Sequence, residues 1–101
     1  MTAYLVIEAR IHDRERFATY ARATPPLVAR HGGRYIVLGG QQSPLEGDWT
    51  GARVVISAWP DAAAARRFWD SPEYAEARRL REGTGEFRVL LVDGTDTTSL
   101  A

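Results

Sequence analysis

The sequence predicts an α+β fold in which a four-stranded sheet carries two helices on one face. Two observations lead to this prediction. Each half of the chain repeats the order of strand, helix and strand, which gives a split βαβ sandwich with the order βαββαβ. All four predicted strands are apolar on both faces, whereas two helices can cover only one face of the sheet. We therefore expect a second copy of the chain to cover the other face.

The first half opens with a strand over about residues 3–10. Asp13 follows it and suits the N-cap of a helix, because its carboxylate can accept the free amides of the first turn. Apolar side chains then recur at helical spacing and mark a buried stripe that ends at His31. The glycine pair 32–33 can end this helix by adopting a positive φ, and a second strand is predicted over 34–38.

Two adjacent prolines, Pro25 and Pro26, interrupt the stripe of the first helix. Proline has no amide proton to donate, and it disfavours a helical conformation in the residue before it. We therefore expect this helix to end near Ala23 and restart, or to kink.

The second half follows a long loop over 39–50, which is rich in glycine and polar residues and is the kind of segment that often carries function. A strand is predicted over about 52–59, and a helix from residue 62 to residue 80. Ser71 and Pro72 should break and restart this helix, because serine caps helices and proline suits the first helical position.

One domain is expected over residues 1–94, with its last strand at about 87–93 and a polar tail over 95–101. Its strands lack the alternation of a sheet with one wet face, since Leu5 and Val6 point to opposite faces and both are apolar. Each large side chain left in water forgoes roughly 1.5–3 kcal/mol of burial. We therefore predict a two-fold dimer with the two sheets packed face to face.

The composition excludes several classes of function. The 101 residues carry 13 basic and 13 acidic side chains, so no overall field attracts nucleic acid or anionic lipid. Acidic residues alternate with the arginines of the second helix, which is typical of a solvated surface. The chain has no cysteine, which excludes disulfides and thiolate chemistry, and no run approaches the roughly 20 apolar residues that span a bilayer. We expect a cytoplasmic protein that binds neither nucleic acid nor a membrane.

Four segments, taken together, carry a resemblance to a known family: His31-Gly32-Gly33-Arg34, Gly39-Gly40, Leu45-Glu46-Gly47-Asp48-Trp49, and Ser71-Pro72-Glu73-Tyr74 with Arg78. Over about residues 3–94 the chain resembles the bacterial family catalogued as domain of unknown function 1330. The resemblance implies a ferredoxin-like fold with an antiparallel sheet, and a homodimer of the dimeric α/β-barrel superfamily. It implies no single activity, since relatives in that superfamily include cofactor-free monooxygenases, isomerases, polyketide cyclases and haem-dependent enzymes.

His31 and Glu46 are the candidate catalytic residues. His31 ends the first predicted helix, and histidine titrates near neutral pH, so it can act as a general acid or base. Its alternative role is to stabilise the negative end of that helix. Glu46 lies in the long loop and can abstract a proton if the loop folds over a cavity. Alternatively, it forms an ion pair with Arg34 or Arg53.

The candidate substrate-binding residues are two arginines and three aromatic residues. Arg34 and Arg53 lie at the near ends of strands two and three, where a guanidinium can hold a carboxylate or enolate through two parallel hydrogen bonds. Trp49, Tyr74 and Trp69 can form the walls of a pocket for a small organic ligand. For Trp69, packing in the core is the alternative.

We therefore expect a homodimer with a small aromatic cavity in each subunit. The predicted activity is cofactor-independent chemistry on a small organic molecule, such as isomerisation, cyclisation or another proton transfer. We predict no cofactor, and no metal site, because the two histidines lie at opposite ends of one helix. The alternatives are a non-catalytic dimer that binds a ligand or assists a neighbouring enzyme, and a cofactor-free monooxygenase.

Overall fold

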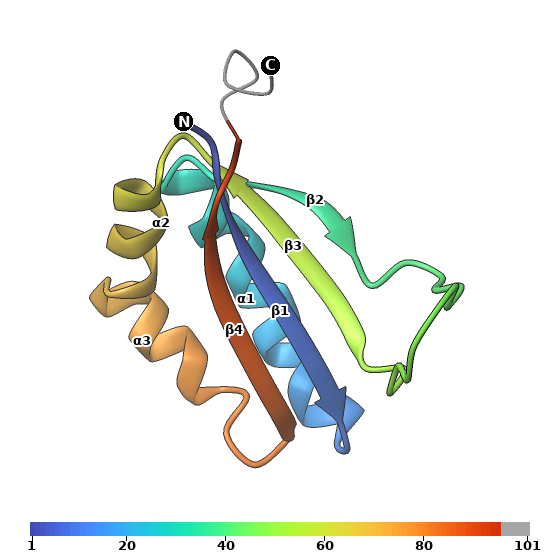
Figure 1. The fold of residues 1–101 in the computed structure, drawn as a ribbon. Helices are drawn as coiled ribbons and strands as arrows, with labels where there is room; N and C mark the ends of the chain where they lie inside the picture. The colour runs from blue at the N-terminus through green and yellow to red at the C-terminus, as the bar shows by residue number, and fades with distance from the viewer. Residues whose placement is uncertain (96–101) are drawn as a thin grey trace.

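The computed structural model describes residues 1–95 of the chain and shows two layers, a sheet and a layer of helices (Figure 1). In chain order the elements are β1 (Ala3–Ile11), α1 (Arg14–Arg30), β2 (Arg34–Leu38), β3 (Arg53–Trp59), α2 (Ala62–Trp69), α3 (Pro72–Arg79) and β4 (Gly85–Asp93). From residue 96 onward, the polar tail that we expected lies outside the described residues.

The sheet has the strand order β2-β3-β1-β4, and every pair of neighbouring strands is antiparallel. All three helices pack on the same face of this sheet (Figure 1). The ferredoxin-like α+β fold predicted from the sequence is therefore confirmed. No helix within residues 1–95 has the length and apolarity needed to cross a membrane.

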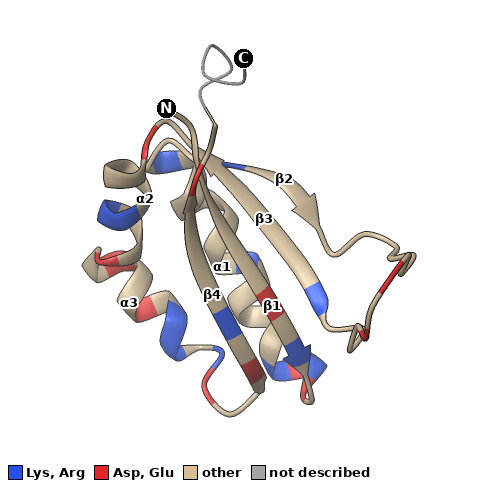
Figure 2. Ribbon diagram, viewed as in Figure 1, with Lys and Arg blue, Asp and Glu red and all other residues tan. Residues whose placement is uncertain are grey.

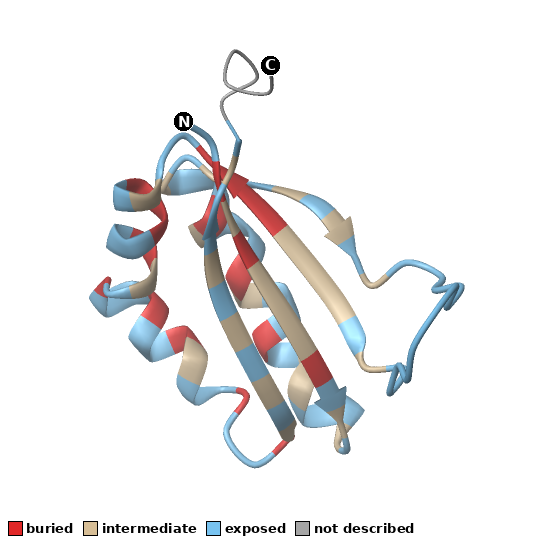
Figure 3. Ribbon diagram, in the orientation of Figure 1, coloured by how far each residue is buried: buried red, intermediate tan, exposed pale blue. Residues whose placement is uncertain are grey.

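The two faces of the sheet differ in burial. Leu5 of β1 points toward the helices and is buried. Its neighbour Val6 points to the opposite face, where it pairs with Ile56 of β3 and Leu90 of β4. Leu90 is 61% exposed. Buried residues concentrate on the helices and on β1 and β3, whereas β2 and β4 have none (Figure 3). The face opposite the helices, called here the open face, keeps apolar side chains in solvent.

The helix α1 differs from the prediction, because it runs through Pro25 and Pro26 without ending near Ala23. A helical amide donates to the carbonyl four residues earlier, so the two prolines leave the carbonyls of Ala21 and Arg22 without a helical partner. Both of these residues are exposed, so water can bond to their carbonyls. The buried stripe of α1 continues on both sides of the prolines, and its packing outweighs the two lost bonds.

The glycine pair ends α1 as predicted. Gly32 adopts φ 91°, and the amide of Gly33 donates to the carbonyl of Val28 at 2.9 Å, in the pattern of a Schellman motif. Gly33 also lies against the indole of Trp59, so that a Cβ at this position would come within 2.7 Å of the ring. The turn therefore needs both glycines, one for its φ and one for its small size.

The second helical segment is divided as predicted, into α2 and α3. Asp61 caps α2 and accepts the amide of Ala64 at 2.8 Å. Ser71 caps α3, with Pro72 at the first helical position. Residues of both charge signs follow one another along these two helices (Figure 2), which is typical of a solvated surface.

Candidate functional site

A cavity of about 190 Å³ lies between the helices and the covered face of the sheet. Its walls are mainly apolar and aromatic, with a few hydroxyl groups, and include Phe17, Tyr20, Tyr35, Phe68, Trp69 and Tyr74. Small-molecule sites have this character, with a few polar groups set in an apolar wall.

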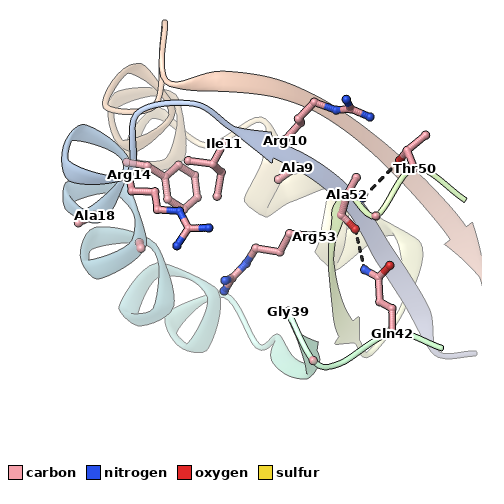
Figure 4. A pocket seen from close by; sticks show the side chains of 14 residues that line it. Ala9, Arg10, Ile11, Arg14, Ala18, Gly39, Gln42, Thr50, Ala52 and Arg53 are labelled. Carbon is pink, nitrogen blue, oxygen red and sulfur yellow. Dashed lines mark hydrogen bonds between the residues drawn. The ribbon is translucent and has the colours of Figure 1, made fainter.

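A wide hollow of about 780 Å³ adjoins the cavity. Figure 4 shows the residues that line this hollow. The two spaces share four lining residues, Ala9, Phe17, Ala21 and Arg53, so we call the hollow the mouth of the cavity. The mouth lies beside the start of α1 and the loop between β2 and β3. Gln42 in this loop donates its side-chain amide to the carbonyl of Ala52 at 2.6 Å and so joins the two sides of the loop.

Two buried tyrosines from different helices meet at the cavity wall. The hydroxyl oxygens of Tyr20 in α1 and Tyr74 in α3 are 2.8 Å apart, at hydrogen-bonding distance. Each phenol has one proton to donate, and the bond between them uses one of the two. The structure gives the second proton no other acceptor among the described residues. The pair can therefore donate one hydrogen bond to a ligand in the cavity.

Burial keeps the phenols of Tyr74 and Tyr35 protonated. It raises the pKa of Tyr74 well above its usual value, and the neighbouring Tyr20 raises it further. Burial, and to a lesser degree the electrostatic interaction with Tyr20, also raises the pKa of Tyr35 on β2 to about 12. At neutral pH Tyr74 and Tyr35 are therefore neutral hydrogen-bond donors in the cavity wall.

Ser71 holds the start of α3 and with it Tyr74. Its Oγ accepts the amide of Tyr74 at 3.1 Å and donates to the carbonyl of Phe68 at 2.8 Å. Tyr74 is 1% exposed and packs against Phe68 and Trp69, with ring centroids 4.5 Å and 5.2 Å away. The position of its hydroxyl is therefore fixed by the cap and by the aromatic core.

Arg53 stands at the boundary between the cavity and its mouth. Its guanidinium lies against Gly39, where a Cβ would come within 2.7 Å of Cζ. Gly39 adopts φ 68° and donates its amide to the carbonyl of Val54 at 2.8 Å, which ties the end of β2 to β3. Within residues 1–95, Arg53 forms no ion pair with Glu46 or with any other carboxylate.

The cavity brings together three of the residues selected from the sequence. Arg53, Trp69 and Tyr74 all line it, although they come from β3, α2 and α3. The structure shows that the three residues line the same cavity, and their roles in binding remain predictions.

The other four selected residues lie elsewhere. His31 caps α1 at the end far from the mouth, donates Nδ1–H to the carbonyl of Leu27 at 2.9 Å, and packs against the core. Arg34 pairs with Ala58 on the open face of the sheet. Trp49, 68% exposed, and Glu46 lie in the long loop, where the indole of Trp49 donates to the carbonyl of Glu46 at 2.7 Å. None of the four lines the cavity.

Sequence reasoning assigned no site role to Tyr20 or Arg14. Tyr20 is the one buried residue of α1 with a phenol hydroxyl. Arg14 lines the mouth together with Phe17 and Ala21, which follow it by three and seven residues and so share its helical face. That spacing is visible in the sequence and is the signal by which Arg14 could have been found.

A search of protein families finds a match over residues 2–95 to the family described as "Domain of unknown function (DUF1330)". The chain belongs to this family. A search of curated proteins finds no match.

Solved structures share the fold of this family member at low sequence identity. A protein of unknown function from Rhodopseudomonas palustris, RPA0582, is 22% identical with a TM-score of 0.75, over 94% of this chain and 83% of that chain. A mutant of SnoaB, a cofactor-independent oxygenase from Streptomyces nogalater, is also 22% identical, with a TM-score of 0.69 over 97% of each chain. A putative antibiotic biosynthesis monooxygenase from Caulobacter crescentus is 14% identical, with a TM-score of 0.61 over 94% of this chain and 91% of that chain.

Proposed function

We propose that the protein is a cofactor-independent enzyme that binds a small oxygen-bearing organic molecule in the cavity and stabilises its phenolate or enolate during a proton transfer. One observation carries this proposal: the Tyr20–Tyr74 pair has a proton to spare at the wall of a cavity that no carboxylate lines. A donor fixed in an apolar site stabilises a developing oxyanion without the cost of reorganising solvent.

The size of the cavity supports a ligand with one aromatic ring. An engineered apolar cavity of roughly 150 Å³ binds benzene, and this cavity measures about 190 Å³ before its mouth is counted. Phe17, Trp69 and the tyrosine rings offer aromatic faces and edges to such a ring.

In this proposal the substrate loses a proton from carbon or oxygen, and the remaining negative charge collects on its oxygen. The tyrosine pair donates a hydrogen bond to that oxygen, and the positive charge of Arg53 adds to its stabilisation. His31 and Glu46 do not line the cavity, so the proposal assigns receipt of the proton to solvent in the mouth.

Two other functions have specific support. The walls of the cavity hold no histidine, aspartate or glutamate that could serve as a general base, and this favours a protein that binds a ligand without converting it. The likeness to SnoaB over nearly the whole of both chains favours a cofactor-free oxygenase. In that case the stabilised carbanion or phenolate would react with oxygen.

Binding of 4-nitrophenol tests the oxyanion site, because its phenolate absorbs visible light and its neutral form does not. We expect bound 4-nitrophenol to have a lower pKa than the free molecule, and Tyr74→Phe to remove most of the difference. Trp49→Phe, in the exposed loop, serves as the control and should leave the shift unchanged. A bound pKa equal to or above that of the free molecule contradicts the proposal.

Catalysis is tested separately with phenylacetone, an enolisable aromatic ketone. Deuterium incorporation from D2O under nitrogen, followed by NMR, should be faster with the wild-type protein than with Tyr74→Phe. Oxygen uptake with an electron-rich phenol would instead favour the oxygenase. Binding accompanied by neither reaction would favour the non-catalytic protein.

We also propose that two copies associate through their open faces. The exposed apolar residues on that face support this association. A solved structure from Bacteroides fragilis, described as a dimeric protein of unknown function and ferredoxin-like fold, supports it as well. That structure is 10% identical, with a TM-score of 0.56 over 92% of this chain and 96% of that chain.

A further inference from the structure

Two arginine side chains face the same space in the mouth of the cavity. Arg14 reaches it from the first turn of α1, and Arg53 reaches it from the start of β3 (Figure 4). Arg10 also lines the mouth, but its side chain points away from the other two (Figure 4). The mouth therefore holds two converging guanidinium groups and a third arginine that does not join them.

These two guanidinium groups have no carboxylate partner within residues 1–95. No aspartate or glutamate lines the cavity or its mouth, and neither Arg14 nor Arg53 takes part in an ion pair. The chain does pair an arginine elsewhere, because Arg88 donates to both carboxylate oxygens of Glu8 on the open face. Most other arginines within the described residues also form no ion pair. Arg14 and Arg53 differ from them because both face one hollow whose wall contains no carboxylate.

The backbone helps to keep Arg53 at this place. Gly39 leaves room for its guanidinium, which would meet a Cβ within 2.7 Å. Two like charges directed into one hollow repel each other, and an anion between them would relieve that repulsion. A guanidinium binds a carboxylate through two parallel hydrogen bonds, so two of them can hold one carboxylate from both sides.

We infer that the ligand is an aromatic carboxylate, with its ring in the cavity and its carboxylate held between Arg14 and Arg53 in the mouth. This inference rests on the proposed function, in that it takes the cavity as the binding site. Arg53 lines both the apolar cavity and its cationic mouth. The cavity suits the aromatic ring of such a molecule, and the mouth suits its carboxylate. A neutral molecule would fill the cavity and leave both guanidinium groups unpaired.

Two probes of the same shape test the inference: 4-hydroxyphenylacetate, and its neutral amide 4-hydroxyphenylacetamide. Their affinities for the wild-type protein and for Arg14→Gln, Arg53→Gln and Arg10→Gln are measured by isothermal titration calorimetry. We expect the carboxylate to bind about tenfold more tightly than the amide, and Arg14→Gln or Arg53→Gln to remove most of that preference, because each deletes a charge-assisted hydrogen bond. Arg10→Gln is the matched control and should keep it.

Each other outcome overturns the inference in a recognisable way. Equal affinity for the carboxylate and the amide would overturn it while leaving the cavity proposal intact. A preference that survives in both the Arg14→Gln and Arg53→Gln variants, or that is lost equally in Arg10→Gln, would show that the general charge of the surface is responsible. If neither probe binds, both the inference and the proposed function fail.

Discussion

The hydroxyl oxygens of Tyr20 and Tyr74 lie 2.8 Å apart in the buried interior, although 54 residues separate the two in the chain. Each ring belongs to a different helix, and α1 and α3 contact each other where the hydroxyls meet. The guanidinium of Arg81 lies over the Tyr20 ring, 5.3 Å from its centre. The pair therefore links the two helices and supplies the polar group of the cavity.

Removing one hydroxyl of this pair should destabilise the protein more than its size suggests. Tyr20→Phe and Tyr74→Phe should each lower the free energy of unfolding by about 1–2 kcal/mol, because the remaining phenol loses its buried partner. The double variant should lose less than the sum, with a coupling of about 1 kcal/mol. Urea unfolding at neutral pH measures these values, with Tyr4→Phe on the open face as the control. Strictly additive losses would show that the bond contributes nothing.

The stability of the fold should fall at alkaline pH because of Tyr35. Burial raises its pKa from 10.0 to about 12 in the folded state, so between these values the folded protein holds a proton that the unfolded chain has lost. The stabilisation is complete below pH 10 and is lost as the pH rises toward 12. Urea unfolding at pH 9 and pH 11 should show the decrease, and Tyr35→Phe should reduce it. An equal decrease in this variant would assign the effect to other groups.

A charge on the open face should prevent association. Leu90→Asp places a carboxylate beside Val6, where a face-to-face dimer would bury it without a partner. Sedimentation velocity should show wild-type dimers and Leu90→Asp monomers, with little change in the fold, because Leu90 is 61% exposed in the single chain. Leu45→Asp, at a position 96% exposed in the long loop, is the control. A wild-type protein that stays monomeric contradicts the dimer.

The close contact at the end of α1 should make Gly33 sensitive to a single methyl group. Gly33→Ala would bring a Cβ within 2.7 Å of the Trp59 indole, and overpacking of this kind costs about 1–3 kcal/mol. Gly40→Ala is the matched control, because a Cβ there meets no atom within 4 Å. Thermal unfolding should show a lower midpoint for the first variant alone. Similar midpoints for both variants would mean that the indole shifts at little cost.

Much of the fold was predictable because local interactions mark the ends of its elements. Asp13 accepts the amide of Arg16 at 3.0 Å, as an N-cap should, and the Ser71–Pro72 break lies where the sequence indicated it. The predicted break at the prolines of α1 is wrong, because the rule behind it considers only neighbouring residues. Tertiary packing of the buried stripe kept the helix continuous there.

Less of the candidate site than of the fold could be predicted from the sequence. Arg34 and Arg53 both lie at strand ends and appeared equivalent in the sequence. The strand register decides between them, because Arg34 falls opposite Ala58 on the open face, while Arg53 falls opposite Ala9 on the covered face. A shift of one position in either strand would have moved its arginine to the other face of the sheet.

The sequence by itself determined the order of elements, the caps and turns that bound them, and the presence of an apolar sheet face that the helices cannot cover. These features depend on contacts within about four residues along the chain and on simple periodicity. Only the tertiary structure decided which hydroxyls meet, which arginines converge and where a cavity remains. Those relationships depend on the packing of α1 against α3 and on the register of β1 with β3, which join residues that are distant in the chain.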